Sequence, residues 1–237
     1  MNSSSELERL YQEFNNGNGF FVDQDACVIC LTGRDCRNFL NSFCTADLQN
    51  LQLGKLTEAF LLDSKGKTLA FALVLATQSG LNMIVPKAQS EMLANHLSKY
   101  LIVEDVLIQT LDNAFVVYFS WQTPESVPTH IGPNIFLSVF TDSIPVELIR
   151  DKVELVKTVF EMIRVENKFP KSGIDILPSN LPQEFERNQT AISFNKGCYL
   201  GQETVARLDA LGHTNRSFCL ITIDCPKNST PQNELTH

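Results

Sequence analysis

Two β-rich apolar segments, residues 59–62 and 68–76, are separated by only five residues, Asp63-Ser64-Lys65-Gly66-Lys67. Segments this close can pair as an antiparallel hairpin but not as parallel neighbours, because a parallel pair needs a crossover of a dozen or more residues. The short polar connection with its glycine is typical of a turn. The chain is therefore expected to contain an antiparallel sheet.

Helical patterns alternate with these β-rich segments. Residues 87–100 carry apolar side chains at helical spacing and predict an amphipathic helix, and residues 151–165 predict a second one. Further strands are predicted at residues 20–22, 26–31, 81–85 and 134–140, and residues 217–223 are a candidate for one more. Single helices between antiparallel strands indicate an α+β fold in which helices cover the sheets.

Charge and cysteine usage exclude several classes of protein. The net charge of −8 argues against direct nucleic-acid binding, which needs clustered positive charge. Cys27 and Cys30 form a C-x-x-C pattern, but they lie in an apolar run that predicts a buried strand, so we expect core cysteines. The four histidines have no metal-ligand spacing, and no metal site is predicted. Without a signal-peptide pattern or a long apolar run, a cytoplasmic protein with no membrane contact is expected.

The segment Lys196-Gly197-Cys198-Tyr199-Leu200-Gly201-Gln202-Glu203, followed by Arg207, concentrates reactive and ligand-binding residue types. Glycines allow unusual backbone angles or close approach, and arginine can grip a carboxylate. A thiol beside a cation gains thiolate character, so Lys196 is expected to favour the reactive form of Cys198. The alternative is a polar loop between structural elements.

This segment resembles the signature of the YgfZ-type folate-binding proteins, which are related to the glycine-cleavage T-protein (aminomethyltransferase). Other motifs of that family occur in the same order, over about residues 20–218. They are Leu31, Gly33, Asp35, Phe39, Leu40 and Asn41, then Thr45 and Asp47, then Leu62 to Lys67, then Arg164, Pro170, Gly173 and Asp175, and finally Leu181 to Glu184.

The resemblance implies a domain organisation. It places a folate-binding-type α+β domain at residues 1–110, with segments of 165–215 returning to it, and a second, ferredoxin-like α+β domain at 111–164. The signature region is expected at 165–218, and residues 219–237 are expected to be a remnant of a barrel domain or a disordered tail. The C-terminal β-barrel of the family is thus expected to be largely absent.

The resemblance also implies a ligand, tetrahydrofolate or another reduced folate. Glu166 matches the position of a pterin-binding glutamate, and the alternative is an exposed acid at a helix end; Lys168, two residues later, departs from the glycine common in the relatives. Arg207 is the candidate for the anionic glutamate tail, against a structural salt bridge. The remaining ligand-binding candidates are Lys196, Gly197, Tyr199, Gly201, Gln202 and Glu203, and Cys198 is the candidate working thiol.

Aminomethyltransferase activity is not expected. The paired aspartates of those enzymes correspond to Ala70 and Phe71, which cannot carry acid–base chemistry. The resemblance instead implies an accessory role in assembling or repairing iron–sulfur clusters and in tRNA modification, with a reduced folate and iron–sulfur enzymes or their assembly proteins as partners. The alternatives are a folate-dependent one-carbon transferase that uses a different carboxylate, and an interaction module that does not bind folate.

Overall fold

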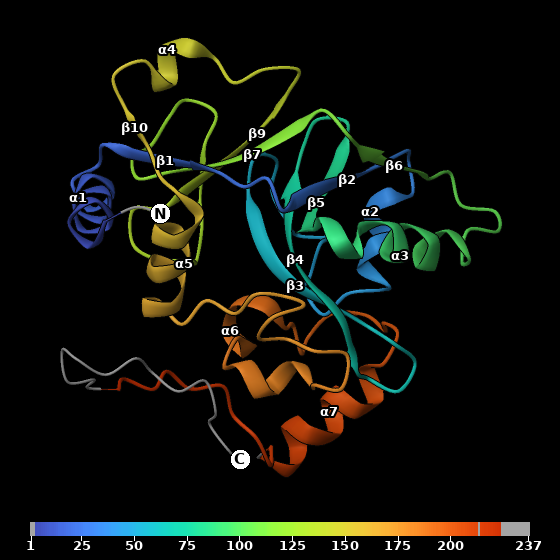
Figure 1. Cartoon of the computed structure of the whole chain (residues 1–237). Coiled ribbons are helices and arrows are strands. Elements are labelled where there is room, and N and C mark those ends of the chain that lie inside the picture. The colour runs from blue at the N-terminus through green and yellow to red at the C-terminus, as the bar shows by residue number, and fades with distance from the viewer. Residues whose placement is uncertain (1–2, 213, 224–237) are drawn as a thin grey trace.

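The computed structural model describes residues 3–212 and 214–223 of the chain. Its framework is two five-stranded sheets (Figure 1). Sheet A has the order β10–β1–β7–β9–β8 and sheet B the order β3–β4–β5–β2–β6. The strands of sheet A are β1 (Gly19–Val22), β7 (Ala114–Phe119), β8 (Val127–Pro128), β9 (Phe136–Thr141) and β10 (Val153–Glu154). Those of sheet B are β2 (Ala26–Thr32), β3 (Leu56–Leu62), β4 (Thr68–Ala76), β5 (Gly80–Pro86) and β6 (Leu107–Leu111).

Pairing is antiparallel throughout sheet B and in sheet A except between β1 and β10, which are parallel. The predicted hairpin is confirmed as β3 and β4. Its turn is fixed by Asp63, whose Oδ1 accepts hydrogen bonds from the backbone N–H groups of Lys65 and Lys67, both at 2.8 Å. Gly66 follows in the left-handed region at φ 80°, as such a turn requires.

Helices of varied length cover the sheets. They are α1 (Ser4–Asn15), α2 (Cys36–Asn41), α3 (Lys87–Ser98), α4 (Val146–Ile149), α5 (Lys157–Glu166), the 3₁₀ turn η1 (Pro182–Phe185), α6 (Asn188–Ala191) and α7 (Gln202–Leu211). The α+β class is confirmed. The described ranges contain no closed barrel and no helix long and apolar enough to cross a membrane.

The two faces of sheet B belong to different parts of the core. On β4, Ala70, Ala72 and Val74 face the cluster that includes residues of α2 and α3. Phe71 and Leu73, between them, face the opposite cluster, which includes residues of sheet A, α1 and α5. This period of two is expected of a strand that is buried on both sides.

The chain crosses between the sheets twice. β1 in sheet A is followed after three residues by β2 in sheet B, and β6 in sheet B is followed after two residues by β7 in sheet A. The two sheets therefore diverge at the short connection of residues 23–25. The expected division into domains is not tested by this arrangement and stays a prediction.

The predictions of two elements were wrong. The helix predicted from residue 151 begins only at Lys157, because Val153 and Glu154 form β10 beside β1, where Gly19 and Phe20 offer an edge for pairing. Residues 217–223 form no strand. Phe218 packs against the core cluster, and its N–H bonds to the carbonyl oxygen of Glu184 at 2.7 Å. Most of the predicted tail, residues 224–237, lies outside the described residues.

Candidate functional site

The signature segment packs on the turn of the β3–β4 hairpin. Figure 1 shows α7, which carries the end of this segment, beneath that hairpin. Gly201 is left-handed at φ 80°, and a Cβ at this position would stand 2.5 Å from the carbonyl oxygen of Asp63 and 2.9 Å from Cα of Gly66. Thr204 donates a hydrogen bond to the carbonyl oxygen of Lys65 at 2.8 Å. Two motifs more than a hundred residues apart in sequence are therefore in direct contact.

Lys196 is occupied by backbone carbonyl groups. Its Nζ donates to the carbonyl oxygens of Asn41, Cys44 and Ala46 at 2.6, 2.9 and 2.5 Å. Burial lowers the pKa of this ammonium, with smaller opposing effects of Cys44 and Asp47. The Lys196 ammonium therefore binds the turn after α2, including the backbone of Cys44. Its donors are used by this turn and not by the neighbouring thiol of Cys198, which was expected to be its partner.

The backbone on either side of Lys196 is tied to the same turn. The N–H of Ser193 bonds to the carbonyl oxygen of Thr45 at 2.8 Å, and the N–H of Leu200 bonds to that of Ser42 at 2.9 Å. Between these two anchors Cys198 is exposed to solvent. The loop therefore presents the thiol at the surface on a backbone held at both ends.

The neighbours of Cys198 differ in burial. Gly197 is exposed, with open space where a Cβ would be. Tyr199 is buried, and burial raises the pKa of its hydroxyl to about 12. The Lys196 ammonium lies 5.0 Å from the centre of the Tyr199 ring, which adds a cation–π contact. Tyr199 is thus part of the packing that supports the loop.

The remaining signature residues lie on α7. The side-chain oxygen of Gln202 accepts the N–H of Tyr199 at 3.2 Å, while Glu203 and Arg207 are exposed. Gln183, from the Pro-Gln-Glu motif, donates to the carbonyl oxygen of Val205 at 2.7 Å. The structure therefore brings the motif residues together around one loop and one helix.

Glu166 lies elsewhere. Tyr11 of α1 donates a hydrogen bond to its Oε2 at 2.7 Å, and this bond is the largest cause of the raised pKa of Tyr11. Glu166 lines an outer hollow beside α1 together with asparagine side chains. It does not join the signature segment.

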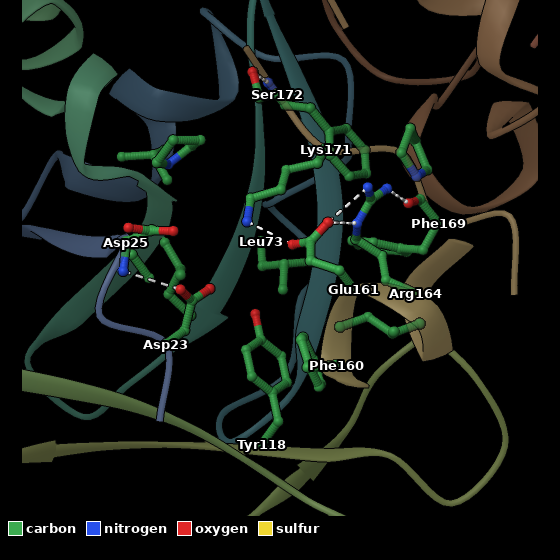
Figure 2. Close-up of a pocket in the computed structure, with 17 residues that line it drawn as sticks. Asp23, Asp25, Leu73, Tyr118, Phe160, Glu161, Arg164, Phe169, Lys171 and Ser172 are labelled. Atoms are coloured by element: carbon green, nitrogen blue, oxygen red, sulfur yellow. Dashed lines mark hydrogen bonds and ion pairs between the residues drawn. The ribbon is translucent and has the colours of Figure 1, made fainter. Parts of the chain in front are cut away.

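A separate cavity of about 80 Å³ lies where the sheets diverge (Figure 2). Its walls are aromatic and aliphatic; they include Phe71, Tyr118, Phe160 and Phe169, with the Tyr118 and Phe160 ring centres 4.7 Å apart. Its polar groups are Asp23, Asp25, Glu161, Arg164, Lys171 and Ser172. None of the site residues predicted from sequence lines this cavity.

One side of the cavity is an ion-pair network. Arg164 is buried, and it binds Glu161 at 2.8 Å, Asp175 at 2.7 Å and the carbonyl oxygen of Phe169 at 2.6 Å. Lys171 pairs with the other oxygen of Glu161 at 2.8 Å. Burial acts to raise the pKa of Glu161, but the bonds from Lys171 and Arg164 outweigh it, so the net shift is downward. Two residues of one predicted motif, Arg164 and Asp175, therefore hold this wall together.

The other side carries an acid and a hydroxyl. The Asp23 carboxylate accepts the N–H of Asp25 at 3.1 Å, and burial raises its pKa. Figure 2 shows the Tyr118 hydroxyl pointing into the space beside Asp23 and Glu161. Burial also raises the pKa of Tyr118 far above its usual value, with a smaller effect of Asp23, so this hydroxyl stays protonated.

Sequence reasoning missed Asp23 and Tyr118. The signal for Asp23 was a pair of acids, Asp23 and Asp25, between two apolar strands. The signal for Tyr118 was a hydroxyl within an otherwise apolar strand. No group of three or more His, Cys, Asp or Glu is placed to hold a metal ion within residues 3–212 and 214–223.

Comparison with known proteins agrees with the resemblance in sequence. No protein-family model matches the chain. It is 26% identical over 221 residues to the tRNA-modifying protein YgfZ of Colwellia psychrerythraea, covering 81% of this chain and 68% of that protein. It is 23% identical over 219 residues to the protein of the same name from Aliivibrio fischeri strain MJ11, covering 84% and 69%.

The fold has a solved counterpart. The structure of glycine cleavage system aminomethyltransferase T from Bartonella henselae superposes with a TM-score of 0.74, at 14% identity, over 90% of this chain and 68% of that one. At this identity the match shows the fold alone. The chain is thus similar to YgfZ proteins in sequence and to an aminomethyltransferase in fold, as the motifs predicted.

Proposed function

We propose that this YgfZ-like chain is a cytoplasmic, tetrahydrofolate-binding accessory protein that supports tRNA modification and the iron–sulfur enzymes involved in it. The role in tRNA modification is carried over from the names of the sequence relatives. The folate and iron–sulfur parts rest on the resemblance of the motifs and on the chemistry of the cavity between the sheets.

The observation that carries the proposal is that cavity. A pterin ring is flat and presents hydrogen-bond donors and acceptors along one edge. The cavity offers aromatic walls in Phe71, Phe160 and Phe169, together with an acid and a protonated hydroxyl in Asp23 and Tyr118. Such a combination of apolar walls and a few placed polar groups is typical of a small-molecule site.

The cavity is small for a bicyclic ring. At about 80 Å³ it has room for two or three waters at roughly 30 Å³ each, and it is smaller than a cavity of about 150 Å³ that admits benzene. The wall made by Phe169, Pro170 and Lys171 follows α5 and has no regular secondary structure. We propose that side chains of this wall shift when the ring enters, while its backbone stays bonded to Arg164 through the Phe169 carbonyl oxygen.

Cys198 is the proposed working thiol. It is exposed on a loop that is anchored by Ser193 and Leu200, so a partner protein can reach it without unfolding the loop. The proposed partners are iron–sulfur enzymes or their assembly proteins. Replacing Cys198 by serine is expected to leave the melting temperature unchanged and to remove the ability to restore tRNA modification in cells that lack their YgfZ-type protein.

The decisive experiment is calorimetric titration of the chain with tetrahydrofolate under reducing conditions. Saturable binding with one site supports the proposal. No binding by a well-folded chain would instead favour an interaction module that does not use folate.

A second candidate function is folate-dependent one-carbon transfer. Phe71 lines the cavity at a position where the resemblance implies an aminomethyltransferase aspartate, but Asp23 supplies a different carboxylate to the same cavity. Turnover of a one-carbon tetrahydrofolate derivative that is lost in Asp23→Asn would favour this candidate. Binding without turnover would favour the accessory role.

A further inference from the structure

Asp23 is held in place by the backbone around it. Its N–H donates to the carbonyl oxygen of Val116 in β7 at 2.9 Å, and its own carbonyl oxygen accepts the N–H of Ala26 at 3.3 Å. Its Oδ1 accepts the N–H of Asp25 at 3.1 Å, which closes an Asx turn. The carboxylate is therefore oriented before any ligand arrives.

The three acids of the cavity differ in their partners. Asp25 is largely exposed and pairs with Lys157, and Glu161 is bound by both Arg164 and Lys171. Asp23 is half-buried and forms no ion pair with any residue that the structure describes. A carboxylate that is partly withdrawn from water without a bonded cation is costly, so of the three acids Asp23 has the most to gain from a donor on a ligand.

We infer that Asp23 is the specificity-determining acid of the cavity, and that it binds the 2-amino-4-oxopyrimidine edge of the ligand ring. This rests on the proposed function and refines it. Such an edge presents two parallel N–H donors, from the ring nitrogen and the exocyclic amine, and these match the two oxygens of one carboxylate. The neighbouring Tyr118 hydroxyl, which stays protonated, donates to the ring carbonyl oxygen.

This assignment replaces Glu166 as the acid that recognises the ring. Glu166 matches the family position in sequence, but its carboxylate is bonded to Tyr11 outside the cavity. Asp23 comes from the connection between β1 and β2, whereas Glu166 ends α5. The two acids therefore give opposite predictions for their variants.

The pH dependence follows from the surroundings of Asp23. The charged and titratable groups that face it are Lys157, Glu161 and Lys171 from the α5 side, Asp25 at the turn, and Tyr118 from β7. Burial raises the pKa of Asp23, and this outweighs the opposing effect of Lys171. Protonation removes an acceptor that the ring donors need, so affinity is expected to fall as the pH drops through the raised pKa.

The test is titration of the full chain with 5-formyltetrahydrofolate and with its 2-desamino analogue. Asp23→Asn keeps the Asx turn but loses one charged acceptor, and is expected to weaken binding of the 2-amino ligand by about 10- to 100-fold. Wild type is expected to prefer the 2-amino ligand, whereas Asp23→Asn loses most of that preference. Glu166→Gln, whose carboxylate lies outside the cavity, is the matched control and should bind as wild type.

The outcomes separate the inference from the function it rests on. If wild type binds and Asp23→Asn binds equally well, the role of Asp23 is overturned while folate binding stands. If a well-folded wild-type chain binds neither ligand, both are overturned. An equal loss in Glu166→Gln would show that Asp23 is not the acid that sets specificity, and a lowered melting temperature in Asp23→Asn would mean that the turn acts structurally; either result would also overturn the inference.

Discussion

Gly66 and Gly201 lie back to back, close enough that a Cβ on Gly201 would stand 2.9 Å from Cα of Gly66. The first glycine closes the β3–β4 turn, and the second precedes α7. Their contact joins the hairpin motif to the signature motif. It explains why two stretches that look like separate functional motifs in sequence both need glycine.

Replacing Gly201 by alanine is expected to destabilise the chain by about 2 to 4 kcal/mol, because the new methyl group meets the Asp63 carbonyl oxygen and the residue must keep a left-handed φ. Urea denaturation measures this. Gly197→Ala is the matched control: it has open space and no positive φ, so its free energy of unfolding should change by less than about 1 kcal/mol. Equal effects in the two variants would contradict the packing described.

Lys168 occupies a left-handed position, with φ 52°, at which the resemblance to the aminomethyltransferases predicts glycine. Lys168→Gly should stabilise the fold by about 0.5 to 1 kcal/mol, since relief of strain exceeds the added entropy of the unfolded chain. Lys168→Ala keeps the strain and should show no gain. Thermal unfolding of the two variants side by side distinguishes backbone strain from loss of the lysine side chain.

Arg164 holds two carboxylates in the wall of the cavity. Arg164→Met leaves Glu161 and Asp175 without their buried cation and should cost about 3 to 5 kcal/mol in unfolding free energy. Arg34→Met removes an ion pair with Asp35 in which the arginine is 81% exposed, and should cost less than about 1 kcal/mol. A small loss in Arg164→Met would show that the wall is not held by this network.

Lys196→Met removes the donor shared by the carbonyl oxygens of Asn41, Cys44 and Ala46. Since buried acceptors are left without a partner, a loss of about 3 kcal/mol is expected. Lys157→Met, which breaks a largely exposed pair with Asp25, serves as the control. Hydrogen exchange at residues 41–46 should speed up in Lys196→Met alone.

Asp23→Asn should stabilise the protein in the absence of ligand, and more so at neutral pH than in acid. The pKa of Asp23 is raised in the folded state, so in the window between its unfolded and folded pKa values the folded state binds more protons. Stability from this group is therefore present below the unfolded pKa and is lost as the pH rises through the folded pKa. The melting temperature of the variant should exceed that of wild type by an amount that grows from pH 3 to pH 8. A difference that stays constant over this range would contradict a raised pKa.

Local patterns predicted much of the fold. The β3–β4 hairpin and the helix at Lys87–Ser98 follow from apolar spacing and turn chemistry, which act over a few residues. Strand β10 could not be predicted this way, because two residues become a strand only when β1 lies beside them. The crossing from sheet A to sheet B is likewise a property of long-range pairing.

Only part of the arrangement of the motif residues follows from the sequence, and their role as a site stays a prediction. The motif residues Lys196, Gly201 and Gln202 do gather around one loop, and the contact of Gly201 with Gly66 shows why. Glu166 could not be placed, because the direction of its side chain depends on Tyr11 at the other end of the chain. Asp23 matched no motif, and only the divergence of the two sheets makes it face a cavity.

The three-residue connection from β1 to β2 also has a mechanical meaning. It joins the two sheets directly, because the strand before it belongs to sheet A and the strand after it to sheet B. A ring held between Asp23 on this connection, Tyr118 on β7 and Phe71 on β4 would crosslink the two sheets. Binding of the ring would then reduce the motion of both sheets without changing the shape of either sheet. Slower amide exchange in β4 and β7 together, on addition of ligand, would be its signature.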